Sequence, residues 1–167
     1  MRDFDLITTL WDETSSTGRD TFTPALGWSL KAPAPVSYPR FRELVAEEMD
    51  LLPDYVFDEL SGGVLVEDRR RLSPDSVADD LFILGLYTWG GLGKQVTLYY
   101  GSFVEVLGSA SEKAYRKRIR ETLRHEFRHH METRAGIFGK GSLLEEDENR
   151  RQRYLQARKG SGKEEEP

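Results

Sequence analysis

Residues 115–132 read YRKRIRETLRHEFRHHME, and this segment sets the architecture expected for the whole chain. Apolar residues recur in it at every fourth position, which predicts one buried stripe along a helix. The stripe consists of Tyr115, Ile119, Leu123, Phe127 and Met131. By the step of about 100° per residue, His125 and His129 lie roughly opposite it. One face of the helix is therefore expected to enter the core, while the other presents two imidazoles to a cleft.

The two histidines enclose the pattern His-Glu-x-x-His, with Glu126 directly after His125. Residues four apart on a helix are neighbours, with Cβ atoms about 5–6 Å apart, so both imidazoles can bind one Zn²⁺. Glu126 then reaches a water on the metal rather than the metal itself. The pattern predicts a hydrolase in which Glu126 activates a zinc-bound water for attack on a carbonyl. His130 is expected to pack or to support a ligand, not to be a fourth ligand.

A catalytic zinc site usually has three protein ligands and one open position. The glycine-bearing turn after the motif can fold the next helix, expected over residues 143–157, back across the first. That helix begins with acidic residues, of which Glu145 is our first choice as third ligand and Glu148 our second, with Glu146 left open. Glu132 would more easily orient a ligand histidine, because three ligands on one straight helix are strained.

Composition limits the classes of protein and of metal site. The chain has no cysteine, which excludes disulfides and thiolate ligands. Its formal net charge of -5 argues against a nucleic-acid partner. No stretch approaches the roughly 20 apolar residues of a membrane span, and the N-terminus has no secretory pattern. We therefore expect a cytoplasmic monomer with no nucleic-acid or membrane partner.

The chain divides into three expected parts. Residues 1–37 predict an N-terminal extension or linker, because they contain loop-forming residues and a proline-rich run at 31–35. Residues 38–157 carry the apolar patterns of one folded domain. Residues 158–167 are charged and glycine-containing, which predicts a disordered tail.

The domain is expected to contain both strands and helices. Short apolar runs rich in β-branched and aromatic residues predict strands at 63–68, 82–87 and 94–100. Helices are predicted at 39–52, briefly at 56–60, and from a capping box at Ser109 and Glu112 to about Arg134, with Gly136 as the stop. Strands followed by helices favour an α+β class.

Three runs together resemble a known family. They are Leu84-Gly85-Leu86-Tyr87, the run from Val96 to Phe103, and the run from His125 to Glu132. In these runs the chain resembles the small bacterial zincin-like metallopeptidases, also called minimal zincins, of the HExxH type. The resemblance covers roughly residues 41–154.

The resemblance implies a compact zincin-like α+β domain. A small mixed sheet would pack on the long motif helix, with a C-terminal helix after it, and zinc would be held by His125 and His129 with Glu126 as general base. An edge strand beside the cleft would bind an extended peptide, and 96–100 is the candidate. This chain lacks the aspartate ligand that many members carry ten residues after the first histidine, where it has Ala135, so the third ligand is expected in the acidic helix.

Three functions follow from this reading. The first is a zinc-dependent metallopeptidase that acts on peptides or protein segments. The alternative is a non-catalytic, zinc-stabilised module that binds a peptide or protein. The third is a zinc hydrolase that acts on a non-peptide amide.

Overall fold

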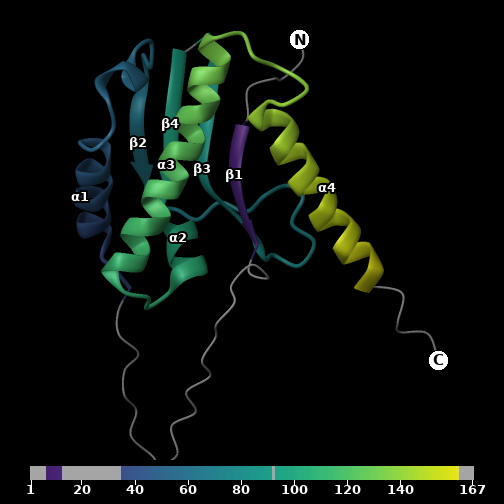
Figure 1. Cartoon of the computed structure of the whole chain (residues 1–167). Coiled ribbons are helices and arrows are strands. Elements are labelled where there is room, and N and C mark those ends of the chain that lie inside the picture. Colours follow the sequence, from purple (N-terminus) through teal and green to yellow (C-terminus); the bar gives the residue numbers. More distant parts are fainter. Residues whose placement is uncertain (1–6, 13–34, 92, 162–167) are drawn as a thin grey trace, which may run out of the picture.

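The computed structural model describes residues 7–12, 35–91 and 93–161 of the chain (Figure 1). Its elements in chain order are strand β1 (Ile7–Asp12), helix α1 (Tyr38–Met49), the short 3₁₀ helix η2 (Asp54–Phe57), strands β2 (Gly63–Glu67), β3 (Leu81–Gly90) and β4 (Gly93–Tyr99), and helices α2 (Tyr100–Leu107), α3 (Glu112–Arg134) and α4 (Leu143–Ser161). The predicted α+β class is confirmed, with the long helix α3 packed on the sheet and followed by α4.

The described strands form one mixed sheet in the order β1-β3-β4-β2. Strands β3 and β4 form an antiparallel hairpin, β2 runs parallel to β4, and β1 runs antiparallel to β3. The prediction that residues 96–100 form an edge strand is wrong, because β4 is paired on both sides, with β3 and with β2. Tyr100 is already the first residue of α2.

Strand β1 lies within residues 1–37, the segment predicted as an extension or linker. It pairs with residues 81–87 of β3 and so adds a fourth strand to the sheet. The other residues of the predicted extension, 1–6 and 13–34, lie outside the described residues. Part of this segment therefore belongs to the folded unit.

At the other end of the chain, α4 continues to Ser161, so residues 158–161 are helical although the sequence predicts them as part of the tail. Residues 162–167 lie outside the described residues. Among the helices that the structure describes, none has both the length and the apolar composition needed to cross a membrane.

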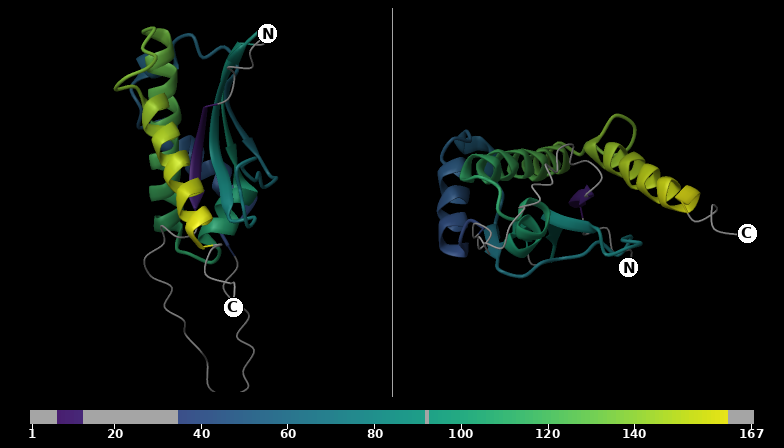
Figure 2. Two further views of the ribbon diagram at one scale, coloured as in Figure 1. Left: turned by 90° about the vertical axis from the view of Figure 1, so that its right-hand side faces the viewer. Right: turned by 90° about the horizontal axis from the view of Figure 1, so that it is seen from below.

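The main core lies between α3, α1 and the sheet (Figure 2). The stripe predicted on α3 is buried within it, with Met131 at the margin: Tyr115, Ile119, Leu123 and Phe127. Phe41 of α1 and Phe103 of α2 pack beside it, with their ring centroids 4.8 Å apart. Each such side chain stabilises the fold by about 1.5–3 kcal/mol when fully buried. The stripe thus fixes the rotation of α3 and directs its histidine-bearing face.

The start of α3 differs from the prediction. Ser111 is the N-cap, and its hydroxyl oxygen accepts a hydrogen bond from the backbone N–H of Ala114 at 3.2 Å. The predicted capping box with Ser109 as N-cap is therefore wrong by two residues. Glu112 is free of that role and accepts two hydrogen bonds from Arg40 of α1, at 2.7 and 3.1 Å. A cross-helix ion pair replaces the expected local cap.

A buried carboxylate also joins α1 to α3. The side chain of Glu48 is only 1% exposed and accepts hydrogen bonds from Arg120 at 2.7 and 3.1 Å and from Arg116 at 3.3 Å. The Arg120 hydrogen bond holds the pKa of Glu48 below its ordinary value, and Arg116 adds to this effect. A carboxylate with a lowered pKa stabilises the folded state at pH values above its unfolded pKa.

We expect Glu48→Gln to lower the free energy of unfolding by about 1–3 kcal/mol at pH 7, because it removes the charge that the two arginines pair with. The stabilisation by Glu48 is lost as pH falls through its lowered folded-state pKa, so the difference between variant and wild type should shrink below about pH 4. Urea unfolding at several pH values measures this. Glu43→Gln, on the exposed side of α1, is the control. A difference that is constant with pH would contradict the assignment.

Candidate metal centre

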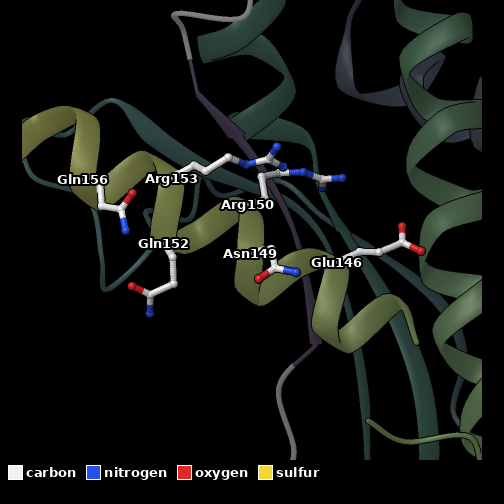
Figure 3. A pocket seen from close by; sticks show the side chains of 6 residues that line it. All are labelled: Glu146, Asn149, Arg150, Gln152, Arg153 and Gln156. Atoms are coloured by element: carbon white, nitrogen blue, oxygen red, sulfur yellow. The ribbon is translucent and has the colours of Figure 1, made fainter. Parts of the chain in front are cut away.

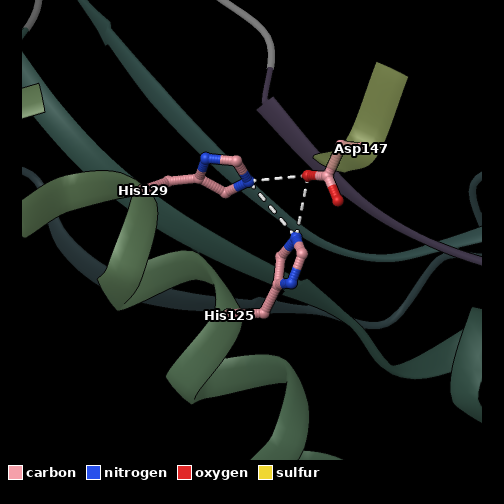
Figure 4. A group of neighbouring side chains, drawn as sticks. All are labelled: His125, His129 and Asp147. Carbon is pink, nitrogen blue, oxygen red and sulfur yellow. Dashed lines mark hydrogen bonds and ion pairs between the residues drawn. The ribbon is translucent and has the colours of Figure 1, made fainter. Parts of the chain in front are cut away.

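Two histidines of α3 and one aspartate of α4 converge on one point (Figure 4). Asp147 Oδ2 lies 2.9 Å from His125 Nε2 and 2.8 Å from His129 Nε2. The two Nε2 atoms are 3.2 Å apart. The two rings therefore turn toward each other and toward the carboxylate, as the spacing of the motif predicts.

The three donor atoms fit a small tetrahedral ion. With metal–ligand bonds of about 2.0–2.1 Å, two ligand atoms of a tetrahedral site lie about 3.3 Å apart. The observed separations of 2.8–3.2 Å are slightly shorter, so a small outward shift of each donor suffices. His129 is 1% exposed, whereas His125 and Asp147 are 14% and 15% exposed. The group could hold a metal ion, with one side left accessible.

Contacts at the start of α4 bring Asp147 to this place. Glu132 of α3 accepts a hydrogen bond from the backbone N–H of Leu143 at 2.8 Å, and so satisfies a free donor in the first turn of α4. Arg128 of α3 pairs with Glu132 at 2.9 Å and with Glu146 at 2.8 Å. The first turn of α4 is thus tied to the same helix that carries the two histidines.

Contacts from the middle of α4 hold it to the loop before β3. Arg151 donates two hydrogen bonds to Asp75, at 2.6 and 2.9 Å. The hydroxyl of Tyr154 donates to Asp80 at 2.7 Å and accepts from the backbone N–H of Val77 at 3.0 Å. Asp147 lies between the two anchored regions, so its position depends on both.

The prediction of Glu145 as the third member of the group does not agree with this geometry. Its carboxylate turns back to the turn before α4 and accepts a hydrogen bond from the backbone N–H of Gly141 at 2.6 Å. The alternatives are also engaged elsewhere: Glu146 with Arg128, Glu148 with Arg151, and Glu132 with the start of α4. Asp147, which was not among the predicted ligands, is the third member of the group.

The burial pattern of α4 explains the choice of Asp147. Leu143 and Tyr154 are buried, and Asp147 and Arg151 are partly buried between them, which gives a stripe at intervals of three and four residues. Glu145 is exposed because it lies on another face of the helix. The spacing of Asp147 from Leu143 and Tyr154 was the available signal in the sequence, since apolar residues indicate which face packs inward.

The pKa values of the two histidines shift in opposite directions. Burial lowers the pKa of His129 below its ordinary value. Burial also lowers the pKa of His125, but the Asp147 carboxylate and the charge of Glu126 outweigh it, so the net shift is upward. Burial opposes ionisation of Asp147, yet its hydrogen bonds to both histidines bring its pKa down to about 2. The group thus contains an ionised carboxylate beside a neutral imidazole, which suits cation binding.

Glu126 lies on the side of α3 that faces β3, and its side chain is fully buried. β3 approaches closely here because residue 85 is glycine. A Cβ atom at Gly85 would lie 2.6 Å from Thr122 Cγ2 and 3.2 Å from Glu126 Oε1. Gly85 therefore permits the strand to pass directly over the carboxylate of Glu126.

We expect Gly85→Ala to destabilise the protein by about 1–3 kcal/mol, because the added methyl group overlaps the side chain of Thr122. Thr122→Ser removes the methyl group of Thr122 that the new Cβ atom at position 85 would meet first. The double variant Gly85→Ala/Thr122→Ser should therefore recover much of the loss, which a double-mutant cycle of thermal or urea unfolding measures. Strictly additive effects of the two substitutions would contradict the close approach.

His130 is not one of the three converging residues and packs in the interior, as predicted. Its side chain is fully buried, with Nε2 2.8 Å from the carbonyl oxygen of Asp58 and Nδ1 3.1 Å from the hydroxyl of Tyr87. Nε2 therefore donates to the carbonyl, and Nδ1 accepts from Tyr87. Burial raises the pKa of Tyr87 to about 12, so its hydroxyl keeps the proton that it donates. This contact ties β3 to α3.

A shallow polar hollow lies along the exposed side of α4 (Figure 3). It is lined by Glu146, Asn149, Arg150, Gln152, Arg153 and Gln156. The hollow contains none of the three converging residues, but it borders them, because Arg150 contacts Asp147 Oδ1 at 3.3 Å. The three converging residues therefore lie beside a surface rich in guanidinium and amide groups.

Comparisons with known proteins agree with the fold. No protein-family model matches the chain, and no curated protein matches it. Among solved structures, the conserved hypothetical protein TTHA0227 from Thermus thermophilus is similar, with a TM-score of 0.52 and 31% sequence identity. The match covers 61% of this chain and 100% of that chain, whose description names no activity. The chain therefore belongs to the same family as this conserved hypothetical protein.

Proposed function

We propose that the protein is a zinc-dependent metallopeptidase of the zincin-like type. The observation that carries the proposal is the convergence of His125, His129 and Asp147, whose donor atoms lie within 2.8–3.2 Å of one another. The two histidines lie on the helix turn that also bears Glu126, and Asp147 comes from α4. Structural zinc sites are closed by four protein ligands, whereas catalytic sites keep three and leave one position open. The group here has three donor atoms and one accessible side, which supports a catalytic rather than a structural zinc site.

The donor set supports zinc as the ion. Two imidazole nitrogens and one carboxylate oxygen form a ligand set found in catalytic zinc sites, and no thiolate is available in this chain. The same set with open positions also suits ferrous iron, so the metal itself has to be measured. Bound zinc acts as a Lewis acid toward a carbonyl oxygen and makes water more acidic.

Glu126 supplies the proton-transfer group in this proposal. It is adjacent to His125 in sequence, and its charge already raises the pKa of that histidine. As general base it takes a proton from the attacking water, and as general acid it passes that proton to the departing amine. Burial under Gly85 of β3 fixes the position of its carboxylate, which such proton transfer requires.

A non-catalytic zinc-stabilised binding module is the second candidate. The pairing of β1 with β3 favours it, because this side of the sheet already accepts an added strand there. In both candidates the partner is an extended peptide or protein segment, and we expect the protein to act as a cytoplasmic monomer. A zinc hydrolase of non-peptide amides would share the same chemistry and differ only in substrate.

The test is zinc-dependent peptide hydrolysis by the purified chain. A library of quenched fluorescent peptides serves as the substrate, and metal content is measured on the same samples. We expect about one zinc per chain, loss of hydrolysis after treatment with a chelator, and recovery when zinc is returned. His129→Ala should show neither zinc nor hydrolysis. Hydrolysis that survives complete removal of the metal would overturn the proposal.

A further inference from the structure

Strand β1 pairs with β3 at the level of Glu126. In the register of the two strands, Thr9 of β1 lies opposite Gly85 of β3. Gly85 is also the residue that packs against Glu126 from the sheet side. The backbone of β1 is therefore one strand away from the residue that marks the proposed reaction centre.

The same strand runs beside the group formed by His125, His129 and Asp147. β1 contacts both α3, which carries His125 and His129, and α4, which carries Asp147. Figure 4 shows the purple ribbon of β1 passing next to Asp147, and Figure 1 shows it between β3 and α4. A backbone in extended conformation thus occupies the open edge of β3, next to the three donors.

We propose that β1 is an internal occupant of the edge at which this protein binds peptides, and that it must leave β3 before a substrate strand can pair there. This inference rests on the proposed function for the identity of the substrate. The edge offers backbone N–H and C=O groups of β3, so the ligand that fits is an extended polypeptide. The N-terminal segment of the chain would then inhibit the enzyme by competition.

Two features make β1 suited to leave. Its pairing with β3 is short, six residues, and is interrupted by a register shift between Thr9 and Leu10. An interrupted ladder forms fewer regular hydrogen bonds and opens at a lower free energy than an interior strand. In contrast, residues 85–90 of β3 and 93–98 of β4 pair without interruption. Opening at β1 therefore leaves the rest of the sheet paired.

An alternative in which β1 stays in the sheet makes the opposite prediction for peptide binding. If β1 is a permanent edge strand, a substrate would pair with the outer side of β1, and fixing β1 in place would not reduce binding. The decisive experiment therefore locks β1 to β3 and measures what happens at the site.

The lock is a disulfide in Thr8→Cys/Leu86→Cys, because these two positions are directly opposite in the register and the chain has no other cysteine. Oxidised and reduced samples of this one variant are compared, with the two single-cysteine variants as redox controls. Binding of a fluorescein-labelled peptide, Gly-Ile-Thr-Thr-Leu-Trp-Asp-Gly, is followed by anisotropy, and hydrolysis of the fluorescent library is followed in parallel. The probe control is a scrambled version of this peptide in which one threonine is replaced by proline.

Apparent affinity falls in proportion to the open fraction, so we expect the oxidised form to bind the peptide at least about tenfold more weakly than the reduced form. Equal binding by both forms, or tighter binding by the oxidised form, would overturn the inference, whatever the hydrolysis assay gives. If the reduced form binds the peptide more tightly but no library peptide is hydrolysed after zinc loading, the inference stands and the peptidase proposal fails.

A second pair of variants repeats the test without a crosslink. One of any two consecutive residues in a strand directs its N–H toward the neighbour, so Thr8→Pro/Thr9→Pro removes at least one hydrogen bond to β3. Thr8→Val/Thr9→Val keeps the backbone donors and favours the strand. We expect the proline pair to raise peptide binding and the valine pair to leave it unchanged or lower it. The reverse order would count against the inference.

Discussion

Asp147→Asn is expected to weaken zinc binding by at least about 100-fold, since even groups that only support metal ligands contribute about 10–100-fold. The substitution keeps the size of the side chain but replaces the charged oxygen that lies 2.8 and 2.9 Å from the two histidine nitrogens. Titration with a competing fluorescent chelator measures the affinity, and circular dichroism checks that the fold is retained.

Glu145→Gln provides the matched control for Asp147→Asn. Both positions lie within the first two turns of α4, and both substitutions exchange a carboxylate for an amide. Glu145 accepts its hydrogen bond from Gly141 and not from the histidines, so its variant should bind zinc as the wild type does. If Glu145→Gln lost zinc and Asp147→Asn retained it, the assignment of the third donor would be wrong.

Glu126→Gln should retain one zinc per chain and lose peptide hydrolysis by about 10²–10⁴-fold, the usual contribution of a general acid–base group. The amide cannot accept the proton of the attacking water, whereas all three metal donors remain. The effect should appear in kcat more than in KM, because the carboxylate acts in the reaction and not in ground-state binding. Stopped assays with zinc-saturated protein measure both constants.

The same variant separates the two candidate functions. A binding module requires no proton transfer, so Glu126→Gln should leave zinc content and peptide capture unchanged and there should be no hydrolysis to lose. Glu121→Gln, on the same helix at an exposed position, is the control for a charge change on α3. Hydrolysis that persists undiminished in Glu126→Gln would exclude Glu126 as the general base.

The motif helix could be predicted in detail because its physics is local. The apolar residues from Tyr115 to Phe127 define one face, and the spacing of His125 and His129 defines what the other face can bind. Neither depends on distant parts of the chain. The same holds for the α+β class, since the strands of the β3–β4 hairpin carry clear apolar runs.

The third donor, Asp147, and the edge strand β1 were not predicted correctly. Both depend on tertiary contacts. Several carboxylates open α4, and only the packing of Leu143 and Tyr154 determines that Asp147 turns inward. β1 becomes a strand through its pairing with β3, although residues around it in sequence have loop composition. The spacing of Asp147 from Leu143 and Tyr154 is the local signal for its choice, whereas the pairing of β1 with β3 requires knowledge of which segments meet.

The distant anchor of α4 has a consequence for metal uptake. Asp75 and Asp80, which hold Arg151 and Tyr154, belong to a loop more than sixty residues before Asp147 in the chain. If the three donors bind an ion, the affinity that a titration gives would therefore be their intrinsic affinity multiplied by the fraction of molecules in which α4 is docked. Metal occupancy would then depend on the docking of α4, and substitution of either aspartate would lower metal binding although neither residue belongs to the group of three donors.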